Sequence, residues 1–207
     1  MLWKPLDVDE NRNHWSAFTQ RFTFKPSLNS DDWPSIQPVV PSRTFDLRGD
    51  HASYDEFLRA ARRVEDAVLD CIGKSLNGAG TTTIYALEWQ GTGYKATVDQ
   101  QADKALPAPP LRVFPDGDYP LLFWRRGEVG VFGDPWEKSL CVFGAPLIEI
   151  ASQRLTWLPP TPHHLNSRGA HRSCRRGTVR RSPAPSSTIR PLTGPLPYVT
   201  NGDSIYL

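Results

Sequence analysis

Apolar residues recur at helical spacing in three stretches of the chain. In residues 8–22 they are aromatic and lie three and four positions apart: Trp15, Phe18 and Phe22. Asp7 or Asp9 can supply the N-cap, so a helix is expected here. The prolines of residues 23–42 exclude a continuing helix and favour an extended connection, after which residues 43–47 have the length of a short strand.

The strongest helical pattern covers residues 54–76. Ser53 and Glu56 form a capping box, in which each side chain binds a backbone N–H group that the first turn leaves unpaired. The face expected to be buried consists of Tyr54, Phe57, Leu58, Ala61, Val64, Val68 and Ile72. A third helix is expected between Gly144 and Pro159, with the same spacing in Leu147, Ile148, Ala151 and Leu155.

Between residues 81 and 143 the pattern changes to short apolar runs separated by turns. TTTIYALEW at residues 81–89 alternates in polarity, so one face should carry Thr83, Tyr85, Leu87 and Trp89. LRVF, YPLLFW, VGVF and SLCVF follow at hairpin spacing, and the glycines of Asp116-Gly117 and Arg126-Gly127 suit tight turns. We therefore predict an α+β fold, in which helices at both ends and one long central helix pack on an antiparallel sheet of about four to six strands.

Residues 159–207 differ in composition from the rest of the chain. They contain eight of the 20 prolines, seven arginines and one acid, Asp203. Such a segment buries too little apolar surface to offset its chain entropy, so we predict a single α+β domain at residues 1–158 and a disordered Pro/Arg-rich tail, which a reading-frame change could also produce. The net charge of +2 divides into −4 for residues 1–158 (17 basic, 21 acidic) and +6 for the tail.

Several functional classes are excluded by what the sequence lacks. No run approaches the roughly 18 apolar residues of a membrane span, and the polar start lacks the apolar stretch of a signal peptide, so a cytoplasmic location is expected. Three cysteines without a close pair, Cys71, Cys141 and Cys174, indicate neither a disulfide framework nor a four-thiolate zinc site. Walker A, G-x-G-x-x-G, G-x-S-x-G and H-E-x-x-H motifs are absent, and no cofactor is expected.

A set of short motifs runs along residues 3–158. They are WSAFTQRFTFKPS, DDWPSI, PSRTFDL, LEWQ and, most specifically, PDGDYPLLFW followed by GVFGDPWEKSLCVFGAPL. Together they resemble a family of small bacterial proteins that is known only as a domain of unknown function. The resemblance supports the domain boundary and implies no established activity.

Two positions depart from the pattern of that family. Asp134 stands where the family usually has histidine, as in FGHPWE. Gly91-Thr92-Gly93-Tyr94 follows LEWQ where the family has a His-Pro pair and an aromatic residue. Any chemistry that depends on those histidines is therefore lost from this chain.

One pair of carboxylates, Asp116 and Asp118, has the spacing of a D-x-D motif. Their oxygens could ligate a divalent cation, which prefers hard oxygen ligands. A hairpin turn, in which the two carboxylates bind local backbone around Gly117, is the favoured alternative.

A second pair, Asp134 and Glu137, flanks Pro135-Trp136. Glu137 is a candidate catalytic acid or base if the tryptophan covers it and raises its pKa, and Asp134 is a weaker candidate. The favoured alternative is a turn in which Glu137 meets solvent or an arginine such as Arg125. Convergence of all four carboxylates would indicate a hydrolase or a metal-assisted enzyme.

The cysteines and the tail offer weaker candidates. Cys141 lies in an apparent strand, and only His14 and His51 could serve as its base within residues 1–158, so a buried structural cysteine is favoured. The tail holds one group of metal-ligand residue types in an order that matches no standard zinc finger: His163, His164, His171 and Cys174. Its arginines would attract phosphates non-specifically, with steep salt dependence.

Aromatic residues are more numerous than a core of this size requires, and several fall near turns or strand ends: Trp33, Tyr85, Trp89, Tyr119, Trp124 and Trp136. The preferred hypothesis is a non-enzymatic module that binds an unknown small molecule or protein partner. Its expected binding face consists of Trp89, Tyr119, Trp136 and Glu137. The alternatives are the enzyme based on the four carboxylates and weak nucleic-acid association through the tail.

Overall fold

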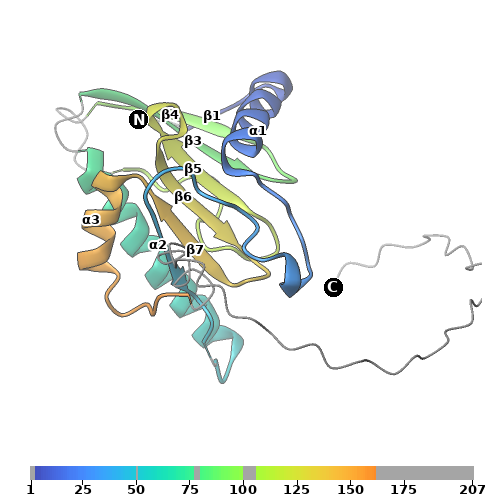
Figure 1. The fold of residues 1–207 in the computed structure, drawn as a ribbon. Helices are drawn as coiled ribbons and strands as arrows, with labels where there is room; N and C mark the ends of the chain where they lie inside the picture. The colour runs from blue at the N-terminus through green and yellow to red at the C-terminus, as the bar shows by residue number, and fades with distance from the viewer. Residues whose placement is uncertain (1–2, 50, 77–79, 100–105, 162–207) are drawn as a thin grey trace, which may run out of the picture. The chain divides into compact units, whose positions relative to one another are not determined.

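The structure is a computed structural model that describes residues 3–49, 51–76, 80–99 and 106–161 (Figure 1). Its helices are α1 (Val8–Phe22), α2 (Tyr54–Leu76) and α3 (Ala145–Arg154). Its strands are β1 (Lys4–Pro5), β2 (Ser42–Asp46), β3 (Thr81–Glu88), β4 (Tyr94–Asp99), β5 (Pro120–Trp124), β6 (Val129–Asp134) and β7 (Ser139–Phe143). Two 3₁₀ turns, η1 (Ser30–Asp32) and η2 (Arg125–Gly127), lie between them. The predicted tail lies outside these ranges, apart from residues 159–161.

All three predicted helices are present, and the first two have the predicted bounds. The carboxylate of Asp7 accepts the N–H of Glu10 at 2.7 Å, which identifies Asp7 as the N-cap of α1. At the start of α2, the Ser53 hydroxyl accepts the N–H of Glu56 at 3.3 Å, and the Glu56 carboxylate accepts the N–H of Ala52 at 2.8 Å. The capping box is therefore confirmed, with its return bond one residue earlier than the motif predicts.

The face predicted for α2 is correct from Ala61 onward, and Cys71 and Leu76 also belong to it. Tyr54 is the exception, because its side chain is 69% exposed. Its ring stacks on Phe57, with 6.1 Å between the ring centroids, and stays outside the core.

The antiparallel sheet has seven strands in the order β1-β4-β3-β5-β6-β7-β2. The prediction of about four to six strands was therefore too low, since β1 and β4 were both missed. β4 has the sequence YKATVD, in which exposed Thr97 and Asp99 alternate with buried Ala96 and Val98, so its apolar run is too short to stand out. The consecutive pairing of β5, β6 and β7 confirms the predicted meander.

The run LRVF, residues 111–114, was predicted as a strand and is irregular. The carboxylate of Glu65 on α2 accepts the N–H groups of Val113 and Phe114 at 3.1 and 3.3 Å. A side chain thus occupies two of the backbone donors that a strand would give to a neighbouring strand. Gly117 does adopt a positive φ of 85°, as expected of a turn, but the turn leads from this irregular segment into β5.

The sheet is covered on both faces, with α1 on one and with α2 and α3 on the other (Figure 1). Successive residues of β5 show this division, since Leu121 and Phe123 pack with α1 whereas Leu122 and Trp124 pack with α2 and α3. Tyr85 and Leu87 share the α1 face of β3 as predicted. Ile84 and Ala86 are buried on the other face of β3. Both faces of this part of the strand are therefore covered, although alternating polarity in a sequence usually indicates that one face meets solvent.

Residues 159–161 continue the ordered body beyond α3. The Pro159 carbonyl accepts the N–H of Asp46 at 2.7 Å, and the Thr161 N–H donates to the Thr44 carbonyl at 3.2 Å. Phe45 and Pro160 form the matching bridge, so this segment covers part of the outer edge of β2. None of the helices in the described ranges is both long and apolar enough to cross a membrane.

Candidate functional site

The strand ends that carry the predicted site residues meet at one end of the sheet. There β3 and β5 pair Glu88 with Pro120, and β6 and β7 pair Asp134 with Ser139. The four residues of the expected binding face, Trp89, Tyr119, Trp136 and Glu137, adjoin these pairs in sequence. Burial separates them, since Trp89 and Trp136 are 37% and 42% exposed whereas Tyr119 and Glu137 are buried. The expected face is therefore not one surface that a partner could contact.

Asp134 stabilises the turn between β6 and β7. One oxygen of its carboxylate accepts the N–H groups of Trp136 and Glu137, each at 3.0 Å, and the other accepts the Ser35 hydroxyl at 2.5 Å. The side chain is 2% exposed, and burial raises its pKa, although these hydrogen bonds act in the opposite direction. Asp134 therefore also ties the connection between α1 and β2 to the sheet.

Glu137 lies beneath this turn, with an exposed fraction of 4%. Its carboxylate accepts the hydroxyl of Ser139 at 2.8 Å. Of the favoured expectation that Glu137 meets solvent or an arginine, the solvent part was wrong, because the turn folds its side chain into the protein. Trp136 and Lys138 are the residues of this turn that reach the surface.

Asp116 and Asp118 make separate local contacts. Asp116 lies 3.4 Å from a guanidinium nitrogen of Arg112. Asp118 accepts the N–H of Gln90 at 3.0 Å and the N–H of Tyr119 at 2.7 Å. Within the described ranges no three side chains of His, Cys, Asp or Glu gather as metal ligands would, so the geometry gives no support to shared cation ligation by the four carboxylates.

Tyr119 and Trp89 belong to an aromatic cluster centred on Phe24. The Phe24 ring lies 5.2 Å from Tyr119 and 4.9 Å from Trp89, measured between ring centroids. The Tyr119 hydroxyl accepts the N–H of Ser27 at 3.1 Å, and burial raises the pKa of this tyrosine. These aromatic side chains fasten the segment after α1 to the sheet, which is a structural role.

Cys141 lies on the α1 face of β7 and is buried, as predicted. Burial raises the pKa of its thiol to about 12 and that of Cys71 to about 11. Both thiols stay protonated near neutral pH, so neither is a ready nucleophile.

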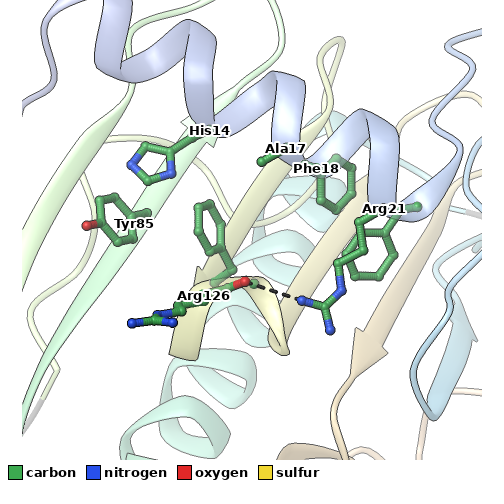
Figure 2. Close-up of a pocket in the computed structure, with 9 residues that line it drawn as sticks. His14, Ala17, Phe18, Arg21, Tyr85 and Arg126 are labelled. Carbon is green, nitrogen blue, oxygen red and sulfur yellow. Dashed lines mark hydrogen bonds between the residues drawn. The ribbon is translucent and has the colours of Figure 1, made fainter.

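A cavity of about 370 Å³ lies between α1 and the sheet, away from the carboxylate-rich end (Figure 2). From α1 it is lined by His14, Ala17, Phe18, Arg21 and Phe22. The sheet contributes Tyr85 from β3 and Phe123 from β5, and the η2 turn contributes Arg126 and Gly127. The volume falls within the range of about 300–1,000 Å³ that is typical of small-molecule sites.

Stacked rings form the floor of the cavity. Tyr85 and Phe123 stack with 5.2 Å between their centroids and an angle of 16° between their planes. The imidazole of His14 lies 4.1 Å from the Tyr85 ring, and Figure 2 shows it pointing from α1 toward that ring. Aromatic surface is therefore presented by elements that are far apart in sequence.

Positive charge lies at the rim of the cavity. Arg21 donates to the carbonyl of Arg126 at 3.4 Å, which leaves most of the N–H groups of its guanidinium for other acceptors. Neither arginine has a salt bridge with a carboxylate of the described residues. Burial is the main influence on His14 and lowers its pKa, so its imidazole is neutral at pH 7.

The η2 turn holds an unfavourable backbone conformation at the edge of the cavity. Arg125, Arg126 and Gly127 have φ values of 50°, 57° and 79°. The left-handed region suits glycine, whereas for other L-residues it costs about 1–2 kcal/mol per residue. The positive φ of Gly127 confirms the turn predicted at Arg126-Gly127. The unfavourable conformation falls on Arg125 and Arg126, which are not glycine.

The cavity was missed in the sequence because its residues come from three distant segments. On α1, His14, Phe18 and Arg21 follow helical spacing, so two polar side chains stand in a stripe that is otherwise apolar. These two polar positions are the only local signal in the sequence for this site. The facing position of Tyr85 depends on strand pairing, which periodicity alone does not determine.

The fold is an α+β domain whose α1 side holds a cavity of small-molecule size. A family model described as "Protein of unknown function (DUF2716)" matches residues 5–148, and the chain belongs to this family. The predicted resemblance to a bacterial domain of unknown function is thereby confirmed. The chain is similar to uncharacterized protein YxiI of Bacillus subtilis (strain 168), with 29% identity over 153 residues that cover 72% of this chain and 91% of the relative. No solved structure matches the chain.

Proposed function

We propose that this protein is a non-enzymatic module that binds a small molecule in the cavity beneath α1. The observation that carries the proposal is the 370 Å³ space with stacked aromatic rings as its floor and exposed Ala17 at its edge. Concave, mostly apolar spaces with a few polar groups are the usual form of small-molecule sites.

The lining favours binding over catalysis. It contains no serine, threonine or cysteine that His14 could activate as a nucleophile, and no carboxylate that could act as an acid or base. Three carboxylates of the alternative hypothesis, those of Asp118, Asp134 and Glu137, accept hydrogen bonds from backbone or hydroxyl groups elsewhere, and that of Asp116 lies against Arg112. The alternative based on the tail concerns residues that lie outside the described ranges. The proposed binding module corresponds to the predicted domain at residues 1–158.

A thermal-shift screen of the full chain against small acids, amines and neutral compounds tests the proposal. A compound that binds the native state raises its apparent stability in proportion to the logarithm of its concentration over Kd. Each hit is then measured by calorimetry with Ala17→Phe, which places a ring at the cavity edge. Ala17 is exposed, so the larger side chain should have little effect on folding.

The matched control is Ser16→Phe, which adds the same ring at the neighbouring exposed position of α1, outside the cavity lining. We expect Ala17→Phe to weaken binding at least about tenfold and Ser16→Phe to leave it unchanged. A screen without a hit, or hits that bind both variants equally well, would refute the proposed function.

A further inference from the structure

We infer that the ligand of this cavity is a small aromatic carboxylate, which lays its ring on Tyr85 and Phe123 and directs its anionic group toward Arg21 and Arg126. The inference rests on the proposed function and specifies its ligand class. It follows from three features of the cavity: the sign of its charge, the chemistry of its floor and the conformation of its rim.

The charge of the cavity lining indicates the charge of the ligand. The lining contains two guanidinium groups and no carboxylate. The carboxylate of Glu10 acts electrostatically on His14, but it forms a salt bridge of 2.6 Å with Lys95. An anion is therefore the partner that the cavity can neutralise, and a carboxylate matches the planar fork of an arginine.

The floor sets the apolar part of the ligand. Tyr85, Phe123 and Phe18 come from three elements and present ring surface to one space. Flat apolar groups gain from offset stacking and edge-to-face contacts with such rings beyond the burial of area alone. An aliphatic chain would gain the area without this geometry, so the floor favours an aromatic ligand.

The rim fixes where the anionic group lies. Figure 2 shows Arg21 reaching across the opening to the η2 turn, where its guanidinium meets the backbone of Arg126. The Arg126 side chain extends from the same turn beneath Tyr85 (Figure 2). Both guanidinium groups thus lie at the η2 edge of the cavity, on either side of the Arg126 backbone in Figure 2.

The conformation of η2 gives independent support. A turn selected for stability alone would place glycine or asparagine at its left-handed positions. Here Arg126 occupies such a position beside the cavity. Strained residues persist where the strained conformation serves a purpose, and positioning a guanidinium at a ligand site is one such purpose.

Calorimetric titration of the full chain with three probes tests the inference. The probes are 2-naphthoate, its neutral analogue 2-naphthamide, and octanoate as an aliphatic anion. We expect 2-naphthoate to bind at least about tenfold more tightly than either of the others. The amide loses the hydrogen bond between a charged group and an arginine, and octanoate loses the stacking contact with the aromatic rings.

The same titration with variants identifies the residues. Arg21→Gln and Arg126→Gln should each weaken 2-naphthoate binding about tenfold and leave 2-naphthamide binding unchanged. Arg12→Gln is the matched control on α1, because Arg12 pairs with Asp9 on the exposed surface, outside the cavity lining. Tyr85→Leu should weaken 2-naphthoate and have less effect on octanoate.

The outcomes separate the two proposals. The inferred ligand class is overturned if 2-naphthamide or octanoate binds as tightly as 2-naphthoate. It is also overturned if Arg21→Gln and Arg126→Gln bind 2-naphthoate as tightly as Arg12→Gln does. Either result leaves the binding function intact. The same conclusion holds if 2-naphthoate fails to bind while another compound binds in an Ala17-dependent manner. If no compound binds, the proposed function fails and the inference fails with it.

Discussion

The two faces of the sheet are covered in different ways. Six spacings of about 4.8 Å make a sheet of seven strands roughly 29 Å wide, whereas a helix with its side chains is about 10–12 Å across. On one face α2 and α3 lie side by side over mostly aliphatic side chains. On the other face α1 is the only helix in the described ranges, and aromatic rings and the connection after it fill the remaining width.

This difference explains where the cavity lies. Large flat rings such as Phe18, Phe22 and Phe24 lie in the layer between α1 and the strands. One helix therefore leaves space beneath it that two adjacent helices would close. A sheet with unequal coverage can keep a stable core on one face and a ligand site on the other.

The largest expected effect contrasts adjacent residues of β5. Trp124→Ala removes a fully buried ring from the α2 and α3 face and should lower the free energy of unfolding by about 3–5 kcal/mol. Phe123→Ala should cost less, because its ring already borders the cavity on the α1 face. Urea denaturation measures both values, and an equal or larger loss for Phe123→Ala would show that the α1 face is packed as tightly as the other.

A second variant tests how the α1 face is held. Asp134→Ala leaves the N–H groups of Trp136 and Glu137 and the Ser35 hydroxyl without their acceptor, at a cost of about 1–3 kcal/mol for each buried group that finds no other partner. Asp134→Asn keeps an oxygen acceptor and removes the buried charge, so it should be much milder at neutral pH.

Hydrogen exchange shows whether that loss is confined to one face. In Asp134→Ala we expect faster exchange in α1 and in residues 23–37 than in α2, because Ser35 belongs to the connection that covers the α1 face. Uniform acceleration in both regions would indicate that Asp134 stabilises the whole domain instead of one face.

A smaller effect of opposite sign is expected at the cavity rim. Arg126→Gly relieves a left-handed residue and should raise the free energy of unfolding by about 1 kcal/mol, while weakening 2-naphthoate. Lys138→Gly is the matched control, because Lys138 has a φ of 52° in the β6–β7 turn and does not line the cavity. It should stabilise the fold to a similar extent and leave binding unchanged. Stabilisation by Lys138→Gly alone would mean that η2 is not strained.

The smallest effect concerns pH. Burial holds the pKa of His14 in the folded protein below its unfolded value of 6.5. As pH falls through 6.5, the unfolded chain binds a proton that the folded protein does not, so stability decreases until pH reaches the folded pKa and is constant below it. Wild type should therefore lose more stability than His14→Gln in this window, measured by denaturation at a series of pH values. Parallel curves would mean that His14 titrates as it does in the unfolded chain.

Much of the local structure could be predicted from the sequence. The bounds of α1 and α2, the N-cap Asp7, the Ser53 capping box and the buried Cys141 all depend on short-range patterns. β4 and the irregular LRVF segment could not be predicted, because their state depends on partners. β4 is completed by strand pairing with β3, and LRVF gives two of its backbone donors to Glu65 of α2.

The candidate site shows the same limit more strongly. Carboxylates and tryptophans close together in sequence drew the prediction to Asp134, Trp136 and Glu137. Hydrogen bonding within that turn turned two of them inward. The cavity instead joins His14 and Arg21 with Tyr85, Phe123 and Arg126, which no sequence spacing relates.

The sequence by itself determined which segments are helical, where their caps lie and that the sheet contains a meander, because capping, turn formation and periodicity act over a few residues. Only the tertiary structure decided which carboxylates are buried, how many strands join the sheet and where a cavity remains. Those outcomes depend on how far apart the layers lie and on which backbone groups find partners across the fold. Such long-range packing and pairing leave no periodic trace in the chain.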